Sequence, residues 1–121
     1  MQKYPRHIGL WLPVVIYCAA IFVLSSFEQA PKPQLLPDKW GHLILFAGLG
    51  FLFARLVAGV KKITFLKLLA ITALFCLAYG ITDEAHQYFV PGRCSEIGDV
   101  IADTIGGFLG VLLYFAVRRR G

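Results

Sequence analysis

Three short stretches of the sequence carry polar side chains about one helical turn apart. Asp38 and His42 stand four positions apart, and so do Asp99 and Asp103. A third stretch brings together two carboxylates, a histidine and an amide: Asp83, Glu84, His86 and Gln87. Because residues four apart lie on the same face of a helix, each stretch can point two functional groups in one direction. Carboxylates and imidazoles arranged in this way are typical of general acid–base catalysis and of divalent-cation sites.

An arginine and a serine extend this set. Arg93 follows the turn signal Pro91-Gly92, and its guanidinium can bind a carboxylate or an anionic substrate group through two parallel hydrogen bonds. We assign candidate catalytic roles to Asp38, His42, Asp83, Glu84, Gln87 and Asp99, and candidate substrate-binding roles to Arg93, Ser26, His86 and Asp103. A set this rich in oxygen suits Mg²⁺, Ca²⁺ or Mn²⁺ before Zn²⁺, and the sequence leaves open whether a divalent cation or any other cofactor binds.

A purely structural role is the alternative for these residues. Asp38 and Asp99 are expected at helix N-termini, where a carboxylate can cap free N–H groups and is favoured by the helix dipole. The dipole disfavours Asp83 and Glu84 near a helix C-terminus, and Asp103 would cost roughly 2 kcal/mol if it faced lipid. An ion-pair network around the arginine that closes one end of the molecule would account for some of these placements. Their convergence at one level favours a functional site.

The polar residues border four apolar stretches of membrane-spanning length: residues 8–27, 40–60, 63–82 and 97–117. Each has about 20 residues, enough at ~1.5 Å per residue to cross the roughly 30 Å hydrocarbon core. With 58% hydrophobic residues, the chain is too apolar for an ordinary soluble domain of its length. We therefore predict an all-α integral membrane four-helix bundle that forms a single domain over residues 1–121.

The distribution of charge predicts the orientation. If the four stretches cross the membrane, nine of the twelve basic residues share one side and all seven acids share the other. The positive-inside rule assigns the basic side to the cytoplasm, so both termini are expected there (N-in/C-in) and the candidate site outside. Because the basic residues are dispersed between apolar stretches, the net charge of +5 does not indicate nucleic acid as a partner.

Small residues predict where helices approach each other closely. Gly48 and Gly50 lie in the second apolar stretch, and Gly106 and Gly110 form a Gly-x-x-x-Gly pattern in the fourth. This pattern permits backbones to touch, either within one chain or between protomers. We expect contact within one chain, and the oligomeric state stays open.

Several of these residues, in this order, resemble a known family. The relevant segments are Asp38-Lys39-Trp40-Gly41-His42, then Tyr79-Gly80-Ile81-Thr82-Asp83-Glu84-Ala85-His86-Gln87-Tyr88-Phe89-Val90-Pro91-Gly92-Arg93, then Asp99 and Asp103 ahead of Gly106. The chain resembles the VanZ-like family of bacterial membrane proteins, named for a protein associated with low-level resistance to the glycopeptide teicoplanin. The position of Asp103 is often asparagine in that family, which argues against a strict need for charge there. The resemblance implies a bacterial cytoplasmic membrane location, a cell-envelope role and a link to glycopeptide susceptibility, and leaves the reaction open.

Three classes of function fit a polar set on membrane helices. The first is an enzyme that acts at the outer leaflet on a lipid-linked or cell-envelope substrate, and the second is a non-catalytic binding protein or a structural cap. The third class is a transporter or channel. It is disfavoured because the only charges near the middle of a span are Arg55 and Lys67, and both can extend to the cytoplasmic interface. No complete set of nucleophile, base and orienting group is evident, so enzyme and binder both stay open. The expected partners are the lipid bilayer and a lipid-linked or cell-wall precursor.

Overall fold

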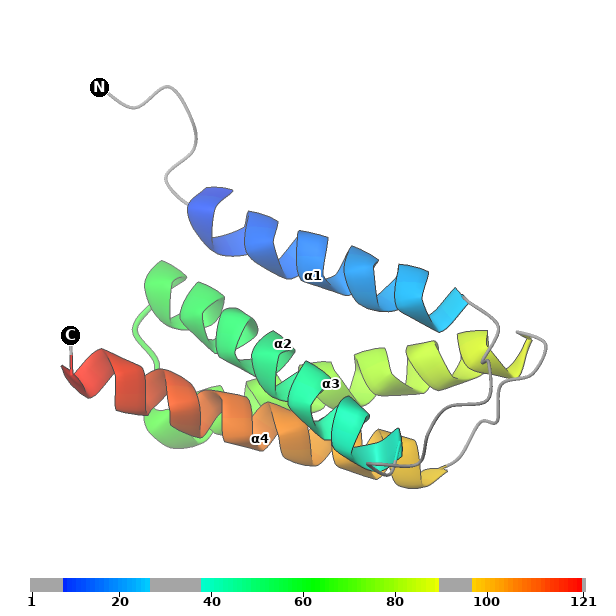
Figure 1. Ribbon diagram of the computed structural model, residues 1–121. Helices are drawn as coiled ribbons and strands as arrows, with labels where there is room; N and C mark the ends of the chain where they lie inside the picture. The colour runs from blue at the N-terminus through cyan, green and yellow to red at the C-terminus, as the bar shows by residue number, and fades with distance from the viewer. Residues whose placement is uncertain (1–7, 27–37, 90–96, 121) are drawn as a thin grey trace.

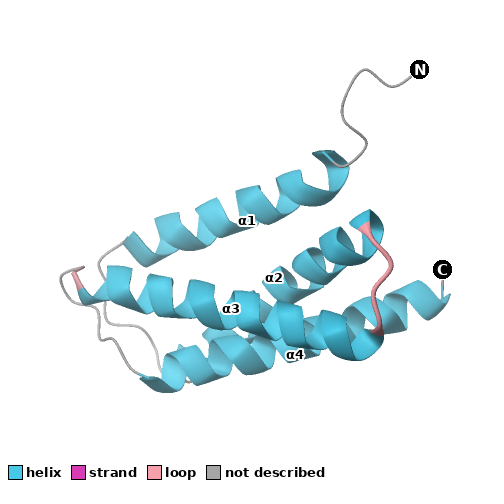
Figure 2. Ribbon diagram, turned by 180° about the vertical axis from the view of Figure 1, so that it is seen from behind, coloured by secondary structure: helices cyan, strands magenta, loops and turns pink. Residues whose placement is uncertain are grey.

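The computed structural model describes residues 8–26, 38–89 and 97–120. Four helices occupy nearly all of these ranges: α1 (Ile8–Ser26), α2 (Asp38–Val60), α3 (Phe65–Tyr88) and α4 (Ile97–Arg120). Figure 1 shows α2, α3 and α4 packed together and α1 lying along one side of them. Figure 2, seen from behind, shows the short loop between α2 and α3 at the end of the molecule that also holds the C-terminus. The all-α, four-helix prediction is confirmed for the described part of the chain.

Three of the described helices are long and apolar enough to cross a membrane. Their apolar windows are Leu43–Val60 in α2, Phe65–His86 in α3 and Ile97–Arg118 in α4, and α1 contributes a shorter apolar stretch, Ile8–Val23. Large hydrophobic side chains such as Leu74 remain exposed on the outside of the helices. That surface would be unfavourable in water and is the expected one in lipid. The protein is therefore a membrane protein whose helices contact the bilayer.

α3 is longer than the apolar pattern predicts. The pattern places its end at Thr82, whereas the helix continues to Tyr88. The polar residues from Asp83 to Gln87 do not break a helix, and the first strong breakers that follow are Pro91 and Gly92. The change from apolar to polar residues thus marks the end of the apolar stretch and not the end of the helix. As a consequence, the acids of this stretch are held by helical backbone.

α2 and α4 meet through backbone contact at the centre of the bundle. A Cβ atom built on Gly106 would lie 2.5 Å from the carbonyl oxygen of Leu43, and one on Gly110 would collide with the carbonyl oxygen of Ala47. Neither position can take a larger residue unless the helices separate. The close approach predicted for Gly106 and Gly110 is therefore found between two helices of one chain.

Two tyrosine hydroxyls connect α1 to its neighbours. Tyr17 on α1 donates a hydrogen bond of 2.7 Å to the carbonyl oxygen of Leu45 on α2. Tyr79 on α3 donates one of 2.6 Å to the carbonyl oxygen of Cys18 on α1. Since a carbonyl oxygen has two lone pairs, each acceptor can serve its own helix and the tyrosine at once. These bonds fix the position of α1 along the axes of α2 and α3.

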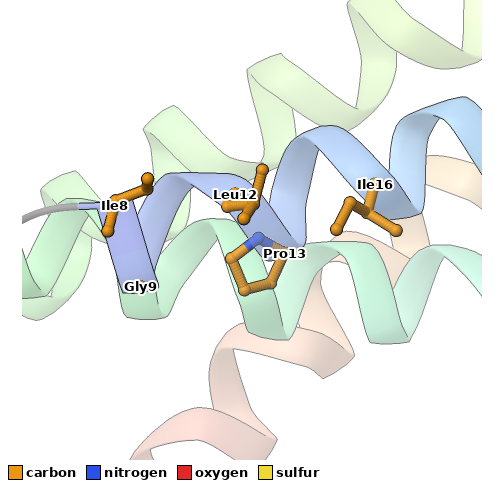
Figure 3. A pocket seen from close by; sticks show the side chains of 5 residues that line it. All are labelled: Ile8, Gly9, Leu12, Pro13 and Ile16. Atoms are coloured by element: carbon orange, nitrogen blue, oxygen red, sulfur yellow. The ribbon is translucent and has the colours of Figure 1, made fainter. Parts of the chain in front are cut away.

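A proline creates a further attachment near the start of α1. Pro13 lies inside the helix and has no N–H, so the carbonyl group of Gly9, four residues earlier, loses its normal helical donor. Arg55 on α2 replaces the missing donor, because its Nη1 donates a hydrogen bond of 2.9 Å to the Gly9 carbonyl oxygen. Figure 3 shows Pro13 in an apolar hollow of about 370 Å³ on α1, lined also by Ile8, Gly9, Leu12 and Ile16. Arg55 thus finds a backbone partner in the neighbouring helix.

Candidate functional site

Four acidic residues are buried at one end of the bundle. In Figure 1, α3 ends and α4 begins at this end, where α1 also ends and α2 begins. The side chains of Asp83 and Glu84 on α3 are each 5% exposed, and those of Asp99 and Asp103 on α4 are 6% and 0% exposed. We call these four residues the buried acids. They are turned into the protein and away from lipid, where carboxylates are most costly.

Asp103 is the acid placed farthest along α4, and a glycine of α3 makes room for it. A Cβ atom built on Gly80 would lie 2.7 Å from Asp103 Oδ2 and 3.2 Å from Asp103 Cβ. Gly80 precedes Asp83 and Glu84 by three and four residues, so all three lie on one face of α3. Asp103 is therefore held against the helical turn that leads to the acids of α3.

α1 contacts the same region through the side chain of His86 on α3. Its ring is stacked on that of Phe22, with ring centroids 4.3 Å apart and an angle of 24° between the planes. His86 is half-buried and stands three residues after Asp83. The hydrogen bond from Tyr79 to the Cys18 carbonyl anchors α1 one turn before Phe22. The aromatic ring of α1 thus covers the histidine of α3 beside the buried acids.

The remaining predicted site residues are placed less completely. Asp38 begins α2, and His42 follows one turn later, so the backbone of α2 brings both to the end of the bundle that holds the buried acids. The side chains of these two residues, of Ser26 and of Gln87 lie outside the described part of the structure, as does the whole of Arg93. Their predicted roles stay predictions.

Two contributors to this region were not predicted. Gly80 lies in the segment Tyr79–Arg93 that resembles the VanZ-like family, and its spacing of three and four residues from Asp83 and Glu84 was the signal that could have revealed it. Phe22 is one of many apolar residues in α1, and nothing in the sequence distinguishes it from its neighbours. Only the packing of α1 on α3 shows that it stacks on His86.

The described groups are suited to acid–base chemistry and to binding polar or cationic groups. Electrostatic interactions are stronger in the poorly hydrated interior of a membrane bundle than in water, so buried carboxyl groups can bind a polar ligand firmly. His86 adds a group that can both donate and accept protons. Among the described side chains, no three histidines, cysteines or acids are arranged to hold a metal ion. Carboxylate oxygens are nevertheless the type of ligand that a hard divalent cation prefers.

Residues 12–118 match the profile of a family described as VanZ/LLP1. No curated protein and no solved structure matches the chain. The family match begins in α1, ends in the last turns of α4 and includes every one of the buried acids. It therefore covers nearly the whole chain, and the protein belongs to the VanZ/LLP1 family.

Proposed function

We propose that the protein acts on a lipid-linked or other cell-envelope substrate whose polar group enters the region of the buried acids. The observation that carries this proposal is the burial of Asp83, Glu84, Asp99 and Asp103 at one end of a membrane bundle. Buried carboxyl groups cost stability when they replace apolar residues, so a purely structural bundle gains little from four of them. A binding or catalytic role accounts for their presence.

The charge distribution supports placing this site on the extracytoplasmic side. All seven acids lie at the opposite side of the membrane from nine of the twelve basic residues, if each helix crosses once. The positive-inside rule then assigns both termini to the cytoplasm of a bacterial cytoplasmic membrane. The substrate would approach from the outer leaflet, where lipid-linked cell-wall precursors are exposed.

The chemistry of the site fits a substrate with both hydroxyl or amino groups and an anionic group. The buried acids would accept hydrogen bonds from hydroxyl or amino groups, and His86 would move a proton at the reacting atom. Arg93 would hold a phosphate or carboxylate through two parallel hydrogen bonds. Asp38, His42 and Gln87 would complete the site.

A non-catalytic role is the second candidate. The burial of all four acids, at 0–6% exposure, also fits a polar cap that closes the bundle. A binding protein of this kind would hold a lipid, a cell-wall precursor or a glycopeptide antibiotic without changing it. In either case, we expect loss of the protein to change glycopeptide susceptibility, with teicoplanin as the first compound to test.

Purified protein tests these alternatives directly. Lipid-linked cell-wall precursors are added to the wild type, and thermal stabilisation and product formation are both measured. Glu84→Gln should lose the response, since it keeps the side-chain shape and removes the carboxylate. Thr82→Ala is the matched control, because Thr82 is exposed and its hydroxyl bonds the Ala78 carbonyl of its own helix at 3.0 Å. A wild type that responds to no precursor, or a Glu84→Gln variant that responds fully, would contradict the proposal.

A further inference from the structure

A hollow lined by lysines lies at the opposite end of the bundle from the buried acids. It has a volume of about 510 Å³ and adjoins the short loop between α2 and α3, at the end of the molecule that also holds the C-terminus (Figure 2). Its lining consists of Lys61, Lys62, Ile63, Thr64, Lys67 and Ile71. All three lysines are exposed, and Ile63 is half-buried. The hollow combines concentrated positive charge with an apolar wall.

The start of α3 adds to this positive character. Thr64 caps the helix, because its Oγ1 accepts a hydrogen bond from the amide of Lys67 at 3.3 Å. The carbonyl of Thr64 accepts the first bond of the helix, from the amide of Leu68, at 2.9 Å. The amides before Leu68 belong to the first turn, where the partial positive charge of a helix attracts anions. Lys67 belongs to this turn, and Lys61 and Lys62 line the same hollow.

No acidic residue of α2 or α3 lies close in sequence to these lysines. No acidic residue stands between Asp38 and Asp83, and none follows Asp103. Asp38 begins α2 and Asp83 lies near the end of α3, so each is separated from the lysines by most of a helix. Three ammonium groups without nearby acids of α2 or α3 create a local potential that attracts anions.

The position of the hollow along the membrane identifies the source of the anion. The apolar window of α2 ends at Val60 and that of α3 begins at Phe65, so Lys61 and Lys62 stand between the two windows, at the level of the phospholipid headgroups. Lys67 lies in the first turn of the α3 window, from which its long side chain can extend to the same level. Ile71 continues the lining toward the hydrocarbon core, and lysine side chains at such a boundary extend to phosphate groups. We propose that this hollow binds the headgroup of an anionic phospholipid, with the upper part of an acyl chain lying against Ile71.

Native mass spectrometry of the full chain tests this site. The protein in detergent is offered equal amounts of phosphatidylglycerol and phosphatidylcholine with the same acyl chains. Each lysine contributes up to about fivefold to the affinity for an anionic headgroup, so the wild type should prefer phosphatidylglycerol by about fivefold or more. The variant Lys61→Gln/Lys62→Gln/Lys67→Gln should lose this preference, whereas Lys61→Arg/Lys62→Arg/Lys67→Arg should keep it because the charge is retained.

A matched control removes the same number of positive charges from the C-terminal end of α4, which lies at the same end of the bundle as the lysines. The variant Arg118→Gln/Arg119→Gln/Arg120→Gln should keep the wild-type preference, and an equal loss in both neutralised variants would overturn the site in favour of general electrostatic attraction. A wild type that retains the two lipids equally would also overturn it. Inorganic phosphate without lipid is the last arm: stabilisation as large as that by phosphatidylglycerol at equal concentration would overturn the lipid assignment in favour of a free anion.

Discussion

Asp103 can be buried inside a membrane bundle because Gly80 leaves space for its carboxyl group. Gly80 has no side chain, so it does not obstruct Asp103 Oδ2. A Cβ atom built on Gly80 would lie only 2.7 Å from that oxygen. Burial of a carboxyl group is unfavourable unless hydrogen bonds or nearby charges compensate it, so this residue constrains how α3 and α4 pack. An asparagine would fill the same space without the charge, which is consistent with a role for Asp103 in shape and hydrogen bonding.

The contact between Gly80 and Asp103 leads to the first prediction. Gly80→Ala should lower the free energy of unfolding by about 1–3 kcal/mol, because the new methyl group displaces a buried carboxyl group. Gly41→Ala is the control, since a Cβ atom there meets nothing within 4 Å and helix propensity alone should make it neutral or stabilising by up to about 1 kcal/mol. Thermal unfolding in detergent measures both. Equal behaviour of the two variants would show that the space at Gly80 does not matter.

For single residues, the sequence indicates which acids lie at one end of the bundle better than it indicates which side chains touch each other. The spacing of Asp83 with Glu84, and of Asp99 with Asp103, was sufficient to propose one polar site, and all four prove to be buried at one end. The pairing of Phe22 with His86 depends on how α1 is rotated and placed against α3. Nothing in a uniformly apolar helix specifies that rotation, so the pairing could not be predicted.

Among the helices, α1 depends on a small number of polar bonds for its attachment. Its outer surface is apolar, as the hollow around Pro13 in Figure 3 shows. Contacts between apolar surfaces give little preference for protein over lipid, so directional bonds acquire more weight in a membrane. The bond from Arg55 to the Gly9 carbonyl exists because Pro13 leaves that oxygen without its usual donor. Pro13 removes one hydrogen bond from α1 and thereby helps to attach α1 to α2.

A double-mutant cycle on Pro13 and Arg55 tests this attachment. Arg55→Met leaves the Gly9 carbonyl without a donor when Pro13 is present, whereas Pro13→Ala restores the N–H that normally bonds it. The loss of stability caused by Arg55→Met should therefore be about 1 kcal/mol smaller in the Pro13→Ala background. Thermal unfolding of the two single variants and the double variant in detergent gives the coupling. Independent, additive effects would contradict the compensation between these residues.

Helix positions were predictable from the sequence to within a few residues, with one informative difference. Apolar length predicts the centre of each helix, because lipid requires about 20 apolar residues for a crossing. It does not predict the end of α3, which continues past Thr82 to Tyr88 through polar residues that are compatible with a helix. Helix breakers, and not hydropathy, determine where such a helix stops.

The whole molecule has two chemically different ends. The buried acids and His86 lie where α3 ends, and the lysine hollow lies where α3 begins. This separation is the basis for our proposed orientation, with the lysines toward the cytoplasm and the acids outside. If both proposals hold, the protein binds anionic lipid on one side of the membrane and its envelope substrate on the other.

Thiol labelling tests the proposed orientation. Cys94 lies between α3 and α4, outside the described residues, whereas Cys76 is buried and Cys18 is half-buried within helices. An impermeant thiol reagent applied to spheroplasts should modify Cys94 and leave the other two cysteines unmodified. A Lys61→Cys substitution in a chain with Cys94→Ser should become reactive only after the membrane is permeabilised. Labelling of that Lys61→Cys chain in sealed spheroplasts would reverse the orientation and place the buried acids in the cytoplasm.

The most direct test of a functional site separates folding from activity in one variant. Asp83→Asn/Glu84→Gln/Asp99→Asn keeps the shape of three buried acids and removes their carboxylates. Because neutral amides are less costly to bury than carboxylates, the variant should unfold within a few degrees of the wild type or above it. We measure its unfolding temperature and its binding of lipid-linked cell-wall precursors together. If the buried acids bind the substrate, the variant should fold and its precursor affinity should fall at least about tenfold. A folded variant that binds precursors like the wild type would contradict the functional site and show that the buried acids form a structural cap.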